Sequence, residues 1–251
     1  MSHKSLRTFQ SLLLALLGLY LLSRVWSGKI LLYINQRFVI LIFLAGLGFI
    51  ILAQVLFSQR QEASAAAEAH QEHNHAGLHM ERIKWNFWWI LFPVLIGFLI
   101  PAKPLGADAL PNRGVTTKAA LSTRLQDSQD SLQVSPTQRT VLDWIRLFAS
   151  ENDVHQFEGQ PVDVTGFVFH DPTLADGQFM VGRFSITCCV ADAFAIGMVV
   201  NKPGLTGLSD NTWIEVQGKL SIATVNGSLL PVIQADAITP VAEPEQPYLF
   251  P

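Results

Sequence analysis

Two neighbouring cysteines, Cys188 and Cys189, carry the most unusual chemistry in this chain, because they are its only thiols. Adjacent Cα atoms lie about 3.8 Å apart, whereas a relaxed disulfide needs roughly 4.4–6.8 Å, so a bridge between them would be strained. If both residues lie in a strand, their side chains point to opposite faces. One thiol is then a core residue, and the other is a candidate soft metal ligand or reactive thiol, with Asp192, His170 and Asp171 as candidate helpers. The alternative is that both thiols are small buried hydrophobes.

A histidine-rich segment is the second candidate site. It holds four of the chain's seven histidines within ten residues, at His70, His73, His75 and His79. Imidazole is a good ligand for zinc and other divalent ions, and spacings of about two to four residues let several rings converge on one ion. The competing interpretation is a solvated polar loop that is incidentally rich in histidine. Neither site contains a nucleophile with a base and an orienting group, so we do not expect an enzyme.

The elements that must position these residues begin with three apolar segments, at 9–26, 38–57 and 85–100. Segment 38–57 has no charged residue, and about twenty residues are enough to cross ~30 Å of hydrocarbon. We therefore predict a multi-pass membrane protein with about three transmembrane helices, residues 1–101, and a histidine-rich loop at 58–84. The alternatives are a signal peptide for the first segment and a re-entrant or interfacial helix for the third. Because the spans offer little polar beyond Gln54, the chain is a poor pore by itself.

A polar linker is predicted at 102–135, followed by a second domain at 136–251. The pattern predicts a helix that begins after Ser135, with Pro136 as its first residue and Gln138 completing a capping box. The apolar residues of this helix recur on one stripe. They are Val141, Trp144, Ile145 and Phe148.

Period-two patterns and β-branched residues predict five strands after Pro161. These strands are placed at 162–169, 178–186, 188–191, 213–223 and 229–235. Asn226 and Gly227 indicate a type I′ hairpin, and Gly166 and Gly218 within strands suit bulges or sharp coiling. Five short strands with one helix are typical of a small OB-like β-barrel, whereas an immunoglobulin-like sandwich would need about seven strands. The net charge of −3 argues against nucleic acid as a partner.

Four strings of residues resemble the bacterial YcgQ-like family of permease subunits. They are SGKILLYINQRF at 27–38, FPVLIGFLIPAKPLGADAL at 92–110, RFSITCCVADA at 183–193 and EQPYLFP at 245–251. The resemblance covers nearly the whole chain and implies a bacterial cell membrane as the location and a separate multi-span permease as partner. It also implies an association with zinc homeostasis, although the four histidines are not part of the matching strings and no catalytic residue is carried over.

The first hypothesis is therefore a membrane-anchored accessory subunit of a two-component permease, with a divalent metal such as zinc as a candidate substrate. The second is a membrane-tethered metal-binding chaperone or sensor without transport activity, and the third is a structural tether without a ligand. The expected partners are the lipid bilayer and the permease, with a homo-oligomer as a further option.

Overall fold

The computed structural model describes residues 3–69, 92, 95–97, 99–116, 134–151, 153–205 and 207–250. These residues form two units, Met1–Lys103 and Pro104–Pro251, and each is described by itself. The four histidines of the loop and most of the third apolar segment, 85–100, lie outside the described residues.

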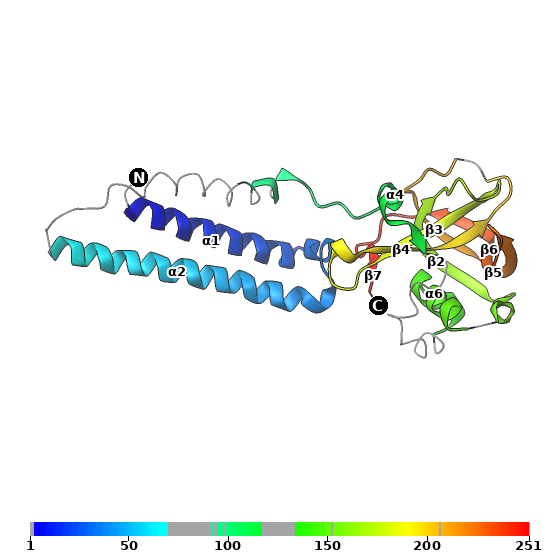
Figure 1. The fold of residues 1–251 in the computed structure, drawn as a ribbon, viewed down its shortest axis with the longest axis horizontal. Coiled ribbons are helices and arrows are strands. Elements are labelled where there is room, and N and C mark those ends of the chain that lie inside the picture. The colour runs from blue at the N-terminus through cyan, green and yellow to red at the C-terminus, as the bar shows by residue number, and fades with distance from the viewer. Residues whose placement is uncertain are drawn as a thin grey trace. The chain divides into compact units, whose positions relative to one another are not determined.

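The first unit is a helical hairpin made of α1, His3–Trp26, and α2, Val39–Ala69 (Figure 1). Two glycines allow the helices to approach closely, since a Cβ placed on Gly18 would lie 2.7 Å from the carbonyl oxygen of Gly46. Small residues are used in this way where helices pack within a membrane. The connection contains the 3-10 turns Lys29–Leu32 and Gln36–Phe38, with the buried Asn35 side chain accepting a bond from the Arg37 amide.

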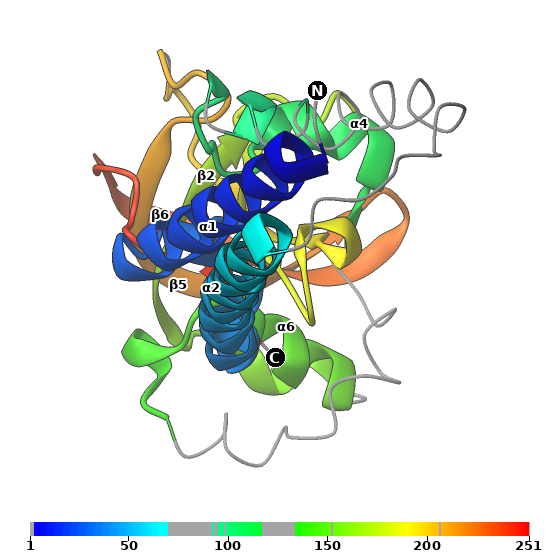
Figure 2. The ribbon, with the colours of Figure 1, turned by 90° about the vertical axis from the view of Figure 1, so that its left-hand side faces the viewer.

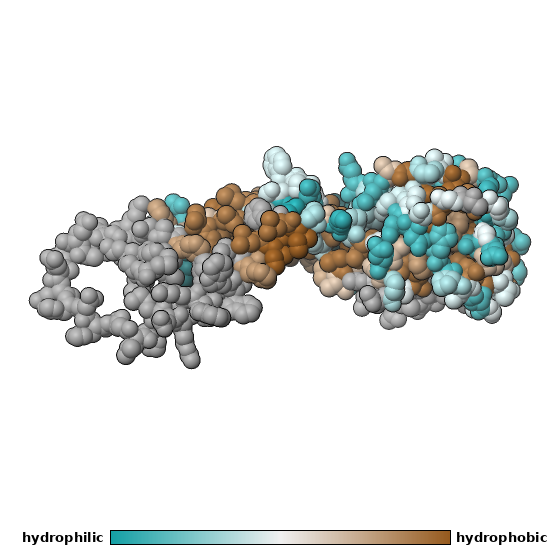
Figure 3. All heavy atoms as spheres, turned by 90° about the horizontal axis from the view of Figure 1, so that it is seen from above, coloured by the Kyte–Doolittle hydropathy of each residue, from teal (hydrophilic) through white to brown (hydrophobic). Residues whose placement is uncertain are grey.

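Two helices among the described residues are long and apolar enough to cross a membrane, over Phe9–Trp26 and Gln36–Gln59. The predicted count of three is not matched, because the third segment is described only in part. Their apolar side chains remain exposed, and Figure 3 shows them as a brown surface. Exposed apolar surface of this extent marks a membrane or protein interface.

The second unit is a mixed sheet with short helices (Figure 1). Its strands are β1 Val115–Thr116, β2 Pro161–Phe169, β3 Gln178–Ser185, β4 Phe194–Asn201, β5 Trp213–Val225, β6 Ser228–Pro240 and β7 Tyr248–Leu249. Its helices are the 3-10 turn Ala107–Ala109, α4 Leu110–Arg113, the 3-10 turn Pro136–Gln138, α6 Val141–Ser150, and the 3-10 turns Val154–Phe157 and Val190–Asp192. The first part of the predicted linker thus belongs to this unit, and residues 117–133 lie outside the described ranges.

The seven strands follow the order β1-β4-β6-β5-β2-β3-β7, with an additional pairing of β3 with β4. Most neighbours are antiparallel, but β4 pairs with β6 in parallel. The pairings among the five long strands therefore form a closed circuit, β2-β3-β4-β6-β5 and back to β2. Outside this circuit, β1 pairs in parallel with β4, and β7 pairs in parallel with β3.

The helix α6 begins five residues later than predicted. Residues Pro136–Gln138 form a separate 3-10 turn, and the extended backbone of Arg139 separates that turn from α6. Thr140 is the N-cap instead, because it and the Asp143 carboxylate satisfy each other's backbone amides in a complete capping box. The predicted stripe is confirmed, because Val141, Trp144 and Ile145 are buried in the core and Phe148 packs partly against it. Figures 1 and 2 show α6 next to the strands of this unit.

The predicted strand at 188–191 is wrong, and the true strand is β4, which begins at Phe194. A turn replaces the predicted strand because the Asp192 carboxylate binds the backbone amides of Thr187 and Cys188. The hairpin prediction is confirmed, since Asn226 and Gly227 have φ angles of 50° and 75°. The predicted irregularity at Gly218 is also confirmed, as the β5–β6 register shifts between Gln217 and Gly218.

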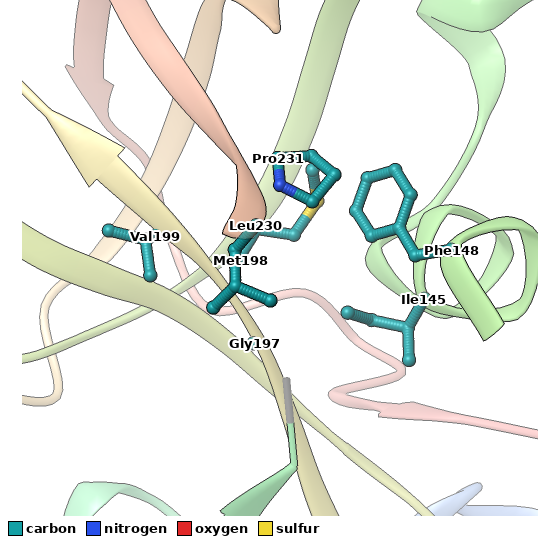
Figure 4. A pocket seen from close by; sticks show the side chains of 7 residues that line it. All are labelled: Ile145, Phe148, Gly197, Met198, Val199, Leu230 and Pro231. Atoms are coloured by element: carbon teal, nitrogen blue, oxygen red, sulfur yellow. The ribbon is translucent and has the colours of Figure 1, made fainter. Parts of the chain in front are cut away.

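A shallow apolar hollow of about 10 Å³, open to solvent, lies between α6 and the sheet (Figure 4). Ile145 and Phe148 of α6 line one side, and residues 197–199 of β4 with Leu230 and Pro231 of β6 line the other. None of these side chains is charged or carries a hydrogen-bonding group, so the hollow offers nothing to orient a polar ligand.

Candidate functional site: the dicysteine turn

The dicysteine turn, residues 187–192, joins β3 to β4 and holds both thiols of the chain. Cys188 is exposed and Cys189 is half-buried, with their sulfur atoms 3.6 Å apart. The prediction that the two side chains lie on opposite faces of a strand is therefore wrong, because the turn brings the sulfurs to one side. The prediction that both are buried hydrophobes fails as well, since the Cys188 side chain faces solvent.

Asp192 organises this turn. Its carboxylate oxygens accept hydrogen bonds from the amide of Thr187 at 3.2 Å and from the amide of Cys188 at 2.8 Å. Its own amide donates to the carbonyl oxygen of Cys189 at 3.0 Å. The sequence predicts Asp192 as a helper of the cysteines, and the structure brings these three residues together.

The electrostatics of the turn keep Cys188 protonated. The interaction of its thiol with the Asp192 carboxylate, followed by the contact with Cys189, raises the pKa of Cys188 to about 11. Partial burial by itself raises the pKa of Asp192. The interactions of its carboxylate with the Cys188 thiol and with backbone amides outweigh that effect, so the pKa of Asp192 is lowered. A thiol must lose its proton before it ligates a metal or attacks an electrophile, so the carboxylate opposes both reactions at neutral pH.

The structure does not bring the other predicted ligands to this turn. His170 instead binds Asp210 twice, through its amide at 2.9 Å and its ring Nδ1 at 2.7 Å. Asp171 closes a local turn by accepting from the Thr173 amide and hydroxyl. Among the described residues, no group of three or more His, Cys, Asp or Glu side chains is placed to hold a metal ion. The predicted metal site at His70, His73, His75 and His79 stays a prediction, outside the described residues.

A buried arginine on the strand that precedes the turn is not predicted by the sequence patterns. Arg183, on β3, donates to the carbonyl oxygens of Pro247, Gln246 and Thr165 at 3.0, 2.9 and 3.3 Å. Its guanidinium also lies 5.1 Å from the ring centroid of Trp213. Burial lowers the pKa of Arg183 to about 10, so it stays charged at neutral pH. A lone Arg in a β-rich sequence gives no local signal for this role.

The strand β7 follows directly after Pro247, whose carbonyl oxygen binds Arg183. Tyr248 and Leu249 form β7 in parallel with Phe184 and Ser185, and the amide of Ile186 donates to Leu249. The buried Tyr248 hydroxyl accepts a 2.8 Å hydrogen bond from the amide of Leu105. Three of the four family-like strings, 92–110, 183–193 and 245–251, therefore meet around one contact cluster, which we call the clasp: Arg183, Tyr248 and Leu105.

We expect replacement of Arg183 by Met to destabilise the second unit. The change removes charged hydrogen bonds to three carbonyls, and a bond of this kind contributes about 1.5–3 kcal/mol. The net loss should be about 2 kcal/mol, because the methionine retains part of the packing on Trp213. Thermal unfolding of the purified full chain in mild detergent should show a lower midpoint. Lys219→Met, an exposed basic residue on β5, is the matched control, and equal midpoints for the two variants would contradict the clasp.

Comparisons with known proteins place these features in one family. The DUF1980 N-terminal domain matches residues 9–116, and the DUF1980 C-terminal domain matches residues 114–251. A Streptococcus mutans protein, provisionally named as a subunit of a two-component membrane permease complex, is 28% identical over 202 aligned positions. That match covers 64% of this chain and 71% of the relative.

The Bacillus subtilis protein YcgQ is 24% identical over 190 aligned positions, which cover 64% of this chain and 66% of YcgQ. The family resemblance read from the four strings is thus confirmed. With both family domains matched in order, from the apolar hairpin to the dicysteine turn and the clasp, the chain belongs to the DUF1980 family.

Proposed function

We propose that this protein is the membrane-anchored accessory subunit of a two-component permease. The observation that carries the proposal is the pair of exposed apolar helices in a chain whose relative is provisionally named as such a subunit. The helices contain few polar groups that could line a path for a solute, so a partner must supply the pore. The proposal assigns no catalytic reaction to this chain.

Recovery of the partner tests this proposal. A C-terminally tagged full chain, extracted from bacterial membranes in mild detergent, is expected to bring down one multi-span membrane protein in comparable amount. An unrelated two-span bait with the same tag identifies proteins that adhere without specificity. Recovery of the bait alone, under conditions in which it stays folded, would contradict an accessory subunit and favour a tether.

The finer architecture is part of the same proposal. We propose that segment 85–100 completes a third span, which makes the chain multi-pass. Contacts within the first unit support this: the Tyr20 hydroxyl and the Arg24 guanidinium both donate to the carbonyl oxygen of Gly97, at 2.8 and 3.2 Å.

We further propose that the closed circuit β2-β3-β4-β6-β5 is an OB-like barrel, and its pairing order and single parallel contact support that assignment.

An OB-like barrel in this chain would lack the usual ligand face. OB-folds bind oligonucleotides on their second and third strands, which correspond here to β3 and β4. Nearly every side chain of these two strands is buried, on both faces. β7 and β1 also occupy their edges near the ends. This covering supports the expectation that nucleic acid is not a partner.

The substrate class that we propose for the permease does not rest on the fold of this chain. A divalent metal such as zinc, as cargo of the permease or as ligand of a chaperone or sensor, is favoured by the four clustered histidines alone. Zinc titration of the full chain, beside a variant with all four histidines changed to Ala, tests it. Equal zinc uptake by the two proteins would remove the loop from the proposal.

A further inference from the structure

Within the described part of the membrane hairpin, the polar side chain of Gln54 forms no hydrogen bond. Gln54 lies on α2 within the span Gln36–Gln59, whose mean hydropathy is 2.8. Its side chain is exposed, and no hydrogen bond to it is formed by the part of the chain that the structure describes. An amide placed in an apolar medium without a hydrogen bond is disfavoured strongly, so a membrane-embedded Gln54 requires a partner group.

Water is a poor candidate for that partner. The nearer end of the span lies on the C-terminal side of Gln54, because Gln59 follows it by five residues. Side chains on an α-helix point toward the helix N-terminus. The Gln54 amide is therefore directed toward the middle of the span and away from its nearer end, which works against reaching the interface.

Gln54 belongs to a regular exposed row on α2, which we call the Gln54 seam. Its members follow one another at alternating intervals of four and three residues, and all are exposed: Ile40, Leu44, Leu47, Ile51, Gln54 and Ser58. This is the spacing of the contact positions in a left-handed helix pair, in which a single polar residue sets the register. The seam lies away from α1, which packs on Gly46 and Ile50 of α2. Ala53 lies on the same face of α2 as these two residues and is buried.

We propose that the Gln54 seam is a self-association surface, through which α2 pairs in parallel with α2 of a second copy of this chain. A carboxamide is self-complementary, since it both donates and accepts hydrogen bonds. Copies inserted in the same orientation place Gln54 at the same depth, so a twofold axis along the membrane normal brings the two amides face to face. Each Gln54 amide then donates a hydrogen bond to the other and accepts one from it, and the apolar residues of the two seams pack above and below the amides.

Cross-linking of the full chain in native membranes tests the geometry. Single cysteines are introduced in a background with Cys188→Ser and Cys189→Ser, without coexpression of any partner. Ile51→Cys, on the seam, is expected to form a disulfide-linked dimer on mild oxidation. Ala53→Cys, on the face that contacts α1, is the matched control and should stay monomeric. Absence of a dimer at Ile51, or equal cross-linking at both positions, would overturn the proposal.

The role of the amide is tested by substitution. Interhelical hydrogen bonds in membranes contribute about 0.6–2 kcal/mol, so Gln54→Leu should weaken self-association roughly threefold to thirtyfold. Gln54→Asn, which keeps the carboxamide, should retain most of it. Fluorescence energy transfer between differently labelled copies in lipid vesicles gives the dissociation constants. If Gln54→Leu leaves self-association unchanged but loses a copurified multi-span protein, the seam contacts the permease instead, and this proposal fails while the proposed function stands.

Discussion

Replacing Asp192 by Asn should make Cys188 react faster with iodoacetamide at pH 8. With a pKa of about 11, roughly one Cys188 in a thousand is a thiolate at this pH. Loss of the carboxylate removes the largest cause of the raised pKa and moves it down toward 9, the value for an unperturbed thiol. The thiolate fraction then rises up to about a hundredfold, while the lower basicity reduces the reactivity of each thiolate several-fold. The expected net gain is up to about tenfold.

The experiment isolates one thiol by using Cys189→Ser as the common background. Alkylation rates are measured from pH 7 to pH 11 with and without Asp192→Asn. The parent should show its rise in rate near the upper end of that range, and the Asn variant should show it at lower pH. Cys188→Ser in the same chain gives the background rate. Superimposed profiles would mean that the Asp192 carboxylate does not hold the Cys188 proton.

A single methyl group on Gly218 should unfold the second unit at markedly lower temperature. A Cβ at this position would collide with the carbonyl oxygen of Gln234 and lie 3.0 Å from the Cα of Ala235. Both contacts are backbone atoms of β6, beside the register shift, so neither can swing aside as a side chain can. Overpacking of this kind costs about 3 kcal/mol. For a unit of this size the midpoint should fall by roughly 6–12 °C.

Gly197→Ala supplies the control for Gly218→Ala. A Cβ on Gly197 meets the terminal methyl of Met180 at 2.9 Å, and that flexible side chain can move. The expected cost is about 1 kcal/mol, or roughly 2–4 °C. Both variants are measured by tryptophan fluorescence during heating of the full chain in mild detergent. A Gly197 variant as unstable as the Gly218 variant would contradict the argument from backbone contacts.

The corrections in the fold share one physical cause. At the start of α6, both Ser135 and Thr140 are good N-cap residues, and the choice depended on which side chain could form the reciprocal bonds with the residue three positions later. At 188–191, small and β-branched residues predicted a strand, but the Asp192 carboxylate provided competing partners for the backbone amides. In both places a local side chain bond overrode the propensity of the segment.

The sequence by itself determined two of the three predicted apolar helices, four of the five predicted strands, the Asn226–Gly227 hairpin and the irregularity at Gly218, because each depends on neighbouring residues. It also singled out Asp192 beside the cysteines, which are near it in the chain.

Only the tertiary structure decided the closed circuit of strand pairings and the clasp. Leu105 and Tyr248 are 143 residues apart, and Arg183 is 63 residues from Gln246. Contacts over such separations form only when the whole unit folds, and a local pattern carries no signal for them. The dicysteine site is different, because its partners lie within five residues of one another: the sequence indicated these residues, but it placed both cysteines in a strand instead of the turn that Asp192 holds.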